Sequence, residues 1–313
     1  MALWHVIEAE LFKVLRKRRL YVLFLLLWLA LPALLILIGF IIKNNVGDSF
    51  VDEGEMVSTA VQGIASPIAI SRLSLFLLSF PQPSYFMIVV ALMAALFMGE
   101  ERTHNMWKTI LTSQPNRLMV LLGKLIAAML LMGILLAGAC LSGMLFGTLA
   151  QSLLDTQFGE GWMELLGFYA YQWLFALPAL LFAFLILWLF RNIALGMVTV
   201  MFLPIFLESL YTFYRLAVGF DRINRFNALL EVLQIQNTLK NLPKYFWTTN
   251  LFAPARQPLA EISKAMGEDF SELQGPFSQF FNGNLQQAAI TLGVYGLVFA
   301  MILFWNFRRK DVA

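Results

Sequence analysis

The residue types that carry out covalent chemistry in enzymes are sparse in this sequence and stand in no catalytic spacing. Gly123 and Lys124 are followed by leucine and have no glycine five residues upstream, so they do not form a phosphate-binding loop. No Gly-x-Ser-x-Gly nucleophile turn, His-Glu-x-x-His zinc motif or paired-cysteine motif occurs. The single cysteine, Cys140, lies in an apolar run. We therefore expect no enzyme activity, no cofactor and no metal site on this chain.

Two ionisable residues fall within one of the apolar runs. Glu208 and Arg215 are seven residues apart, about two helical turns, so they would share one face of a helix. Ionisable groups at membrane depth are costly and usually face a cavity or a partner. Two interpretations stay open: the pair lines a pathway, or it caps the helix near the outer interface. The spans carry no row of carboxylates of the kind expected in a proton-coupled carrier.

The elements that hold these residues are predicted to be membrane helices. Of 313 residues, 60% are hydrophobic and 13% charged, against about 45–50% and about 25% in soluble domains. The apolar residues form long runs, and the first is too long for a signal peptide. We predict an all-α integral membrane protein with six transmembrane helices, at about 20–42, 85–99, 118–149, 168–190, 193–216 and 287–307.

Prolines are expected to shape three of these spans. Pro81 and Pro83 should interrupt any lead-in to the second span within 73–80, while Pro178 and Pro204 should kink spans four and five. The third span is too long for one straight crossing, so one of its ends should project into water.

The distribution of basic residues predicts the orientation. With the N-terminus inside, the inner segments hold 13 of the 22 basic residues but only five acidic ones. An excess of lysine and arginine marks the cytoplasmic side of short loops. We therefore expect both termini to be cytoplasmic and the protein to lie in the inner (plasma) membrane.

A segment of about 1–19 precedes the first span. Apolar side chains recur in it at helical spacing, at Leu3, Trp4, Ile7, Leu11, Val14 and Leu15. This pattern predicts an amphipathic helix in the cytoplasmic interface. It would be either a generic membrane anchor or an elbow that packs on the bundle and meets a partner. The remaining residues, 20–313, should form one membrane domain.

Spans two and three are joined by a short segment, 99–115, that is compatible with a helix ending at Pro115. It presents Met106, Trp107, Ile110 and Leu111 among polar residues. Such aromatic and aliphatic anchors beside charges suit a protein-binding helix. The alternative is that this helix lies on the membrane surface.

Two further features lie in and after the spans. Gly143 and Gly147 form a Gly-x-x-x-Gly pair in span three, a pattern that allows helices to approach closely at a seam, including one between two copies. Residues 217–286 form an external helical segment between spans five and six, which could include re-entrant pieces. Within it, the aromatic stretch 242–254 is typical of a turn at the membrane interface.

The segment 99–126 resembles type-2 ATP-binding-cassette (ABC) export permeases, nearest the bacitracin- and lantibiotic-resistance subfamily. That subfamily has the run "GxE … TWKxLLTxPxSR … xxKL", and this chain has Gly99-Glu100-Glu101, then Asn105-Met106-Trp107-Lys108-Thr109-Ile110-Leu111-Thr112-Ser113-Gln114-Pro115-Asn116-Arg117 and Gly123-Lys124-Leu125. Weaker matches are Glu10-Leu11-Phe12-Lys13 before the first span and Phe307-Arg308-Arg309-Lys310 after the last. The six spans match in order. Asn116 replaces the family's usual serine, and the external segment is longer than usual.

The resemblance implies a coupling helix at about 100–115 that docks on a separate ABC ATPase subunit. The contact residues it implies are Glu100, Glu101, Trp107, Lys108, Leu111 and Arg117. It also implies two ATPase copies that bind ATP and magnesium, and a second permease, either a copy of this chain or a paralogue. The partners expected are these subunits and lipid, with no nucleic acid.

The function that follows is export of an amphipathic substrate, such as a peptide antibiotic or a lipid. Two alternatives stay open. In the first, an ATPase-driven scaffold permease acts on an extracytoplasmic protein through the external segment and moves no cargo. In the second, the chain is an ATPase-independent carrier.

Overall fold

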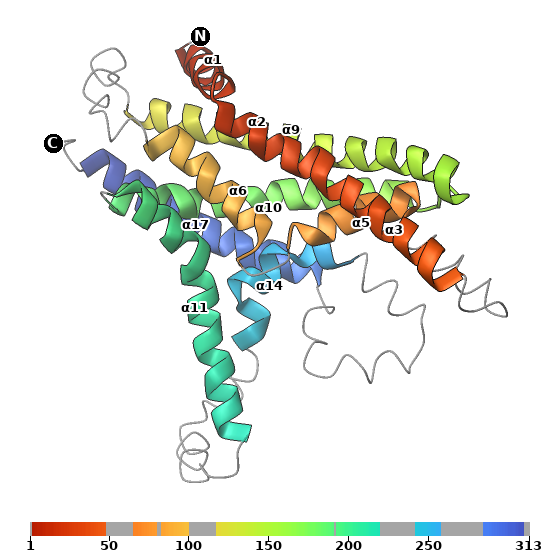
Figure 1. Cartoon of the computed structure of the whole chain (residues 1–313). Coiled ribbons are helices and arrows are strands. Elements are labelled where there is room, and N and C mark those ends of the chain that lie inside the picture. The colour runs from red at the N-terminus through yellow and green to blue at the C-terminus, as the bar shows by residue number, and fades with distance from the viewer. Residues whose placement is uncertain are drawn as a thin grey trace.

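The computed structural model describes residues 2–47, 65–79, 83–99, 117–190, 192–219, 242–257 and 284–309, and within them every regular element is a helix (Figure 1). The first half contains α1 (Ala2–Leu15), α2 (Arg18–Leu25), the π-helical turn η1 (Leu26–Ala30), α3 (Leu31–Gly47), α5 (Pro67–Leu77), α6 (Tyr85–Ala94) and the π-helical turn η2 (Ala95–Gly99). The second half contains α9 (Arg117–Leu154), α10 (Trp162–Leu189), α11 (Ile193–Gly219), the 3-10 turn η4 (Leu242–Tyr245), α14 (Trp247–Leu251) and α17 (Leu285–Arg309).

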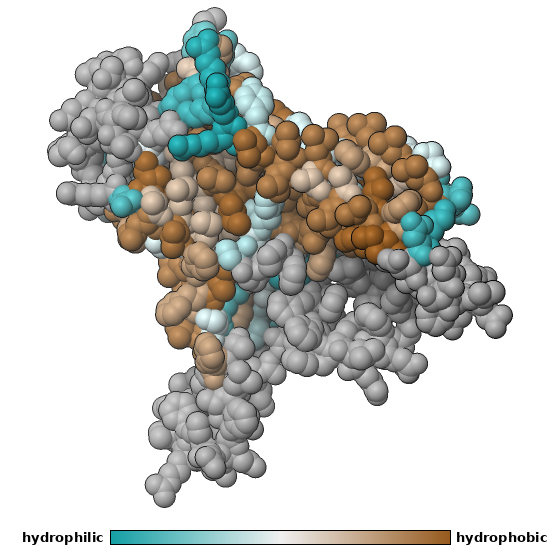
Figure 2. Space-filling model, viewed as in Figure 1, coloured by the Kyte–Doolittle hydropathy of each residue, from teal (hydrophilic) through white to brown (hydrophobic). Residues whose placement is uncertain are grey.

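Five helices of the described residues are long and apolar enough to cross a membrane. They are Arg18–Ile41, Leu118–Leu154, Trp162–Leu189, Ile193–Tyr211 and Leu285–Arg308. Each coincides with a predicted span, and Figure 2 shows hydrophobic surface between hydrophilic groups at two ends of the molecule. The prediction of an all-helical integral membrane protein is confirmed.

The second predicted span is a short helix. α6 has 10 residues and η2 has 5. Together they form about 22 Å of helix, which is shorter than the hydrocarbon core of a membrane, about 30 Å. α5 precedes α6 along the length of the bundle (Figure 1), and the Phe86 N–H donates to the Leu78 carbonyl at 3.0 Å across the break. Pro83 lies in this break, whereas Pro81 is outside the described residues. Among the described residues, helix length alone therefore gives five crossings, and α5 and α6 could make a further one only by crossing together.

Both pieces of this broken segment have their own N-terminal caps. The Ser66 hydroxyl accepts from the Ala69 N–H at 3.3 Å, and the Ser84 hydroxyl accepts from the Met87 N–H at 3.2 Å. Such caps satisfy backbone donors that have no partner inside the helix. The break is thus supported by hydrogen bonds on the α6 side, deep in the bundle, where no water is available.

The predicted glycine pair lies where α5 packs on α9. A Cβ at Gly147 would lie 2.2 Å from the Pro67 Cα, and a Cβ at Gly143 would lie 2.4 Å from the Ser71 Oγ. Only glycine allows backbones to approach this closely. The seam is therefore between two helices of one chain, and α5 occupies the face that a contact between two copies would need.

The centre of the bundle is α10, which packs against α6, α9, α11 and α17. Its residues from Ala179 to Trp188 are buried on all sides, as expected for a helix without a polar face. α11 is the opposite case: Figure 1 shows it turning away from the other helices, and only 17% of its spanning window is buried.

Part of the predicted external segment lies inside the bundle. Residues 242–257 pack against α10, α11 and α17, and Trp247, Leu251 and Phe252 are buried. The Gln172 side-chain amide of α10 donates to the Leu251 carbonyl at 3.2 Å. We call residues 242–257 the inserted segment. Its buried part runs from Trp247 to Arg256, whereas η4 contains no buried residue.

Candidate functional site

Two sites contain the buried charges of the described residues. The first is at the end of the bundle where α1, η2, the first turn of α9 and the last turn of α17 lie, which we call the terminal end (Figure 1). There α1 lies along α9 with Val6, Ile7 and Val14 buried. A Cβ at Gly123 would lie 2.5 Å from the Val6 Cγ1, so the two helices are in close contact.

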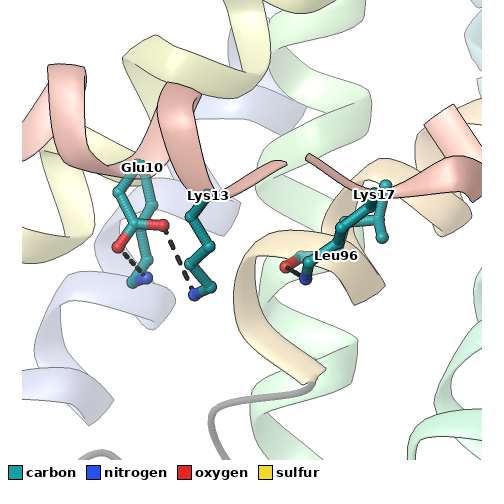
Figure 3. Close-up of polar contacts among 5 residues, drawn as sticks. Glu10, Lys13, Lys17 and Leu96 are labelled. Carbon is teal, nitrogen blue, oxygen red and sulfur yellow. Dashed lines mark hydrogen bonds and ion pairs between the residues drawn. The ribbon is translucent and has the colours of Figure 1, made fainter. Parts of the chain in front are cut away.

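A buried ion pair joins the same two helices (Figure 3). The Lys124 ammonium group donates to the Glu10 carboxylate at 2.5 Å, and Lys124 has no exposed surface. The Lys13 ammonium group lies 3.7 Å from the other oxygen of Glu10. A charge buried this deeply is tolerated only when it is paired. The pair therefore fixes α1 on α9 at one register.

The chain after α1 is attached to a second element. The Lys17 ammonium group donates to the Leu96 carbonyl of η2 at 3.3 Å (Figure 3). In a π-helical turn the regular backbone pairing is disturbed, which leaves carbonyl groups open to such donors. α1 and the residues that follow it thus contact both η2, which ends at Gly99, and α9, which begins at Arg117.

This arrangement fixes the two ends of residues 100–116. Five of the predicted contact residues, Glu100, Glu101, Trp107, Lys108 and Leu111, lie outside the described residues. The sixth, Arg117, is the first residue of α9. The structure therefore locates the segment's two attachment points at the terminal end and beside α1.

The faces of α1 differ from the simple apolar stripe expected from its sequence. Ile7 and Val14 of that stripe are buried, but Trp4 and Leu15 are exposed. Phe12 is also exposed, with the Arg16 guanidinium 4.0 Å above its ring. One face of α1 thus packs on the bundle, while a second presents aromatic and basic side chains outward. The sequence analysis did not predict that Glu10 is buried. The signal that could have revealed it is helical spacing, which places this acidic residue on the same side of α1 as Val6 and Val14.

The second site surrounds Glu208 in the second half of α11. The Thr248 N–H donates to Glu208 Oε1 at 2.8 Å, and the Thr248 hydroxyl donates to Oε2. Arg256 is buried nearby; burial lowers the pKa of Arg256 to about 10, and the negative charge of Glu208 opposes that shift.

The second residue that helical spacing placed on this face, Arg215, lies further along α11, and its side chain is outside the described part of the structure. Thr248 and Arg256 come from the inserted segment, 40 residues or more beyond Glu208 in the sequence. Periodicity within one helix could not reveal that contact.

Glu208 also lines a cavity of about 330 Å³ between α11, α10, α17 and the inserted segment. We call it the aromatic cavity, since six of its lining residues are aromatic. Its lining is Phe182, Leu203, Pro204, Leu207, Glu208, Leu242, Tyr245, Phe246, Trp247, Tyr295 and Phe299. A concave apolar site with few polar groups is the usual form of a small-molecule site.

Comparison with known proteins identifies the family. The model of the family described as "ABC-2 family transporter protein" matches residues 6–207, which include most of α1, all of η2, α9 and α10, and the start of α11. No curated protein and no solved structure matches the chain. Glu208 and the inserted segment lie beyond the matched residues. The family implies an integral membrane permease with an ABC ATPase as its partner, and this chain belongs to the ABC-2 family of transporter proteins.

Proposed function

We propose that this permease is the transmembrane subunit of an ATP-driven exporter and that residues 100–116 form the coupling helix that docks on a separate ATPase subunit. The observation that carries the proposal is the attachment of both ends of this segment to α1. Lys17 holds η2 on one side, and the Glu10–Lys124 pair holds α9 on the other. A push on the segment would thus be transmitted to α6, α9 and α1 together.

In this proposal the terminal end faces the cytoplasm. Five basic residues cluster around the junction of α1 and the first span, at Lys13, Arg16, Lys17, Arg18 and Arg19. Such clusters mark the cytoplasmic side of a membrane helix. Both ends of the described chain, α1 and α17, would then be cytoplasmic, with α5 and α6 together completing a sixth crossing of the plasma membrane.

The working assembly would contain two permeases and two ATPases. ATP and magnesium would bind to the ATPase subunits, and the permease itself would carry no catalytic group. Closure of the ATPase pair would move the coupling helices and shift the permeases between inward-open and outward-open states. α11, of whose spanning window only 17% is buried, is a helix on which the second permease could pack. The cargo would be amphipathic, such as a lipid or a peptide antibiotic.

Co-purification from the native host tests the proposal. Tagged wild-type permease should bring down an ABC ATPase, while the double variant Trp107→Ala plus Leu111→Ala should lose most of it. The matched control is Met163→Ala plus Leu166→Ala, which removes two exposed apolar side chains at the other end of the bundle. Absence of any ATPase with the wild type, or equal recovery with both double variants, would contradict the proposal.

A further inference from the structure

A groove opens at the terminal end, between the start of the first membrane helix and the start of α11. It has a volume of about 90 Å³, and Arg19 of α2 lines it together with apolar side chains of α2, α6, η2 and α11, at Leu23, Leu92, Ala95, Leu96, Ile193 and Met197. Ala95 and Leu96 are buried at its floor. Ile193 and Met197 are partly exposed, so the groove reaches the protein surface. We call it the interfacial groove.

The depth of the interfacial groove matches the level of lipid headgroups. One spanning helix begins at Arg18 and another at Ile193, while η2 ends at Gly99. Elements that cross a membrane begin and end near its polar surfaces. Arg19 therefore lies at the level of the headgroups, and Leu23 lies about one helical turn deeper, at the level of the acyl chains.

Two arginines at the start of α2 have no partner among the described residues. Arg18 and Arg19 are exposed, and neither makes a hydrogen bond or an ion pair with the part of the chain that the structure describes. Glu10, the buried acid of α1, pairs with Lys124 instead. The Lys17 ammonium group also lies at the groove, since its acceptor is a carbonyl group of the lining. The interfacial groove therefore combines an apolar lining with a positive rim.

This combination favours an anionic phospholipid over other occupants. Acyl chains match the apolar lining, and a phosphate group accepts charge-assisted hydrogen bonds from an arginine. A neutral lipid makes only the first of these contacts. A second copy of the chain, related by two-fold symmetry, would bring its own basic cluster to the same level of the membrane, where like charges repel each other.

We propose that the interfacial groove binds an anionic phospholipid. Arg19 binds the phosphate group, and one acyl chain enters the groove beside Leu23 and Met197. The groove has room for only part of a chain, so the remainder lies along α2 and α11, both of which expose apolar side chains. The bound lipid also contacts η2, the element that precedes residues 100–116. In the orientation proposed above, this lipid belongs to the cytoplasmic leaflet.

Native mass spectrometry of the purified permease in neutral detergent tests the site. The probes are phosphatidylglycerol, phosphatidylcholine and diacylglycerol with the same chains, and glycerol phosphate as a headgroup without chains. We expect phosphatidylglycerol to bind at least about fivefold more tightly than phosphatidylcholine, the size of the attraction between one basic residue and an anionic membrane surface. Diacylglycerol should bind more weakly than both. Equal binding of the three lipids, or displacement of phosphatidylglycerol by equimolar glycerol phosphate, would overturn the proposal.

A charge variant and a neighbouring control locate the phosphate group. Arg19→Gln removes the guanidinium group of the groove, and it should weaken phosphatidylglycerol binding about fivefold. Arg18→Gln removes an exposed guanidinium group that does not line the groove. Its effect should be less than about twofold, because a charge without direct contact is screened by solvent. Equal losses in the two variants would mean that the whole basic cluster attracts the lipid, which contradicts a site at Arg19.

A second pair of variants tests the apolar part of the interfacial groove. Met197→Trp fills the groove without changing its charge, so it should weaken the binding of both phospholipids. Leu195→Trp, at an exposed position of α11 outside the lining, is the control and should leave binding unchanged. The same spectra report the oligomeric state. Loss of a dimer in Met197→Trp with unchanged lipid binding would assign the groove to the second permease and rule out the lipid site.

The outcome is independent of the function proposed above, because the measurement contains neither nucleotide nor ATPase. If no ATPase co-purifies with the permease but phosphatidylglycerol selection at Arg19 persists, the proposed function fails and the lipid site stands. If the ATPase co-purifies and the selection is absent, the lipid site fails and the proposed function stands.

Discussion

Lys124 has no exposed surface, and its ammonium group lies 2.5 Å from the Glu10 carboxylate, in a contact between residues 114 positions apart. At the scale of single residues, this pair shows what the sequence can and cannot reveal. Lys124 stands out as a cation in an apolar run, and Glu10 as an acid in a helix with apolar faces. Their pairing depends on how α1 packs on α9, which no local pattern encodes.

Breaking this pair should destabilise the protein. Lys124→Met leaves Glu10 buried beside Lys13 alone, and the loss should be about 3–5 kcal/mol, typical of one partner removed from a buried pair. Lys43→Met is the matched control, since Lys43 pairs with exposed Asp155 at 3.4 Å and exposed pairs contribute about 0–1 kcal/mol. Thermal unfolding in one detergent measures both.

A double variant separates charge from packing. Glu10→Leu plus Lys124→Met removes both charges, and it should recover much of the stability lost in Lys124→Met. If Lys124→Met melts at the same temperature as Lys43→Met, the buried pair does not hold α1.

At the Glu208 site, too, the sequence singles out a residue but does not reveal its contacts. The sequence singled out Glu208 as a charge within an apolar run, and the structure assigns it Thr248 and Arg256 as neighbours. Trp247 was noted only as one member of an aromatic stretch. Its role depends on rings from α10 and α17, which are distant in sequence.

At the scale of elements, hydropathy predicted the long helices well. Five predicted spans coincide with continuous helices, because an apolar run of that length has few other stable forms in a membrane. The second span was predicted with a break at its prolines, and α5 and α6 are separate helices at that point. The burial of Trp247, Leu251 and Phe252 was not predicted, since aromatic and aliphatic residues suit both an interface and a buried contact.

The contact between α5 and α9 leads to a prediction on Gly147. Gly147→Ala would place a Cβ 2.2 Å from the Pro67 Cα, so α5 must move away, at a cost of about 1–3 kcal/mol. Gly167→Ala, in α10 with nothing within 4 Å of the added Cβ, should be neutral or slightly stabilising. Thermal unfolding of the two variants compares them directly. Equal melting temperatures would mean that the two helices do not touch at Gly147.

At the scale of the whole molecule, the proposed orientation rests on the basic residues at the terminal end. In a Cys140→Ala background, a cysteine at Asp155 should react with a membrane-impermeant maleimide added to intact cells or spheroplasts. A cysteine at Trp4 should react only after permeabilisation. Both native side chains are exposed, so access in the fold does not limit either. The opposite pattern would invert the proposed topology.

The family match and the geometry of the terminal end both support the proposal that this chain is an ABC permease whose residues 100–116 dock on an ATPase. Residues 6–207 match the ABC-2 family, and both ends of residues 100–116 attach beside α1. The sequence predicts a docking segment at about 100–115 from aromatic and aliphatic residues among polar ones and from family resemblance. The proposed contact with an ATPase would form only in the assembly, so the structure of one chain shows where the described ends of the segment are anchored.

Photo-crosslinking tests that central claim most directly. A photoreactive phenylalanine analogue is placed at Trp107, within the proposed coupling helix, or at Met163, which is 84% exposed at the other end of the bundle. After irradiation in the native host, the account predicts a crosslink from position 107 to an ABC ATPase and none from position 163. No ATPase crosslink from position 107, or equal crosslinks from both positions, would contradict it.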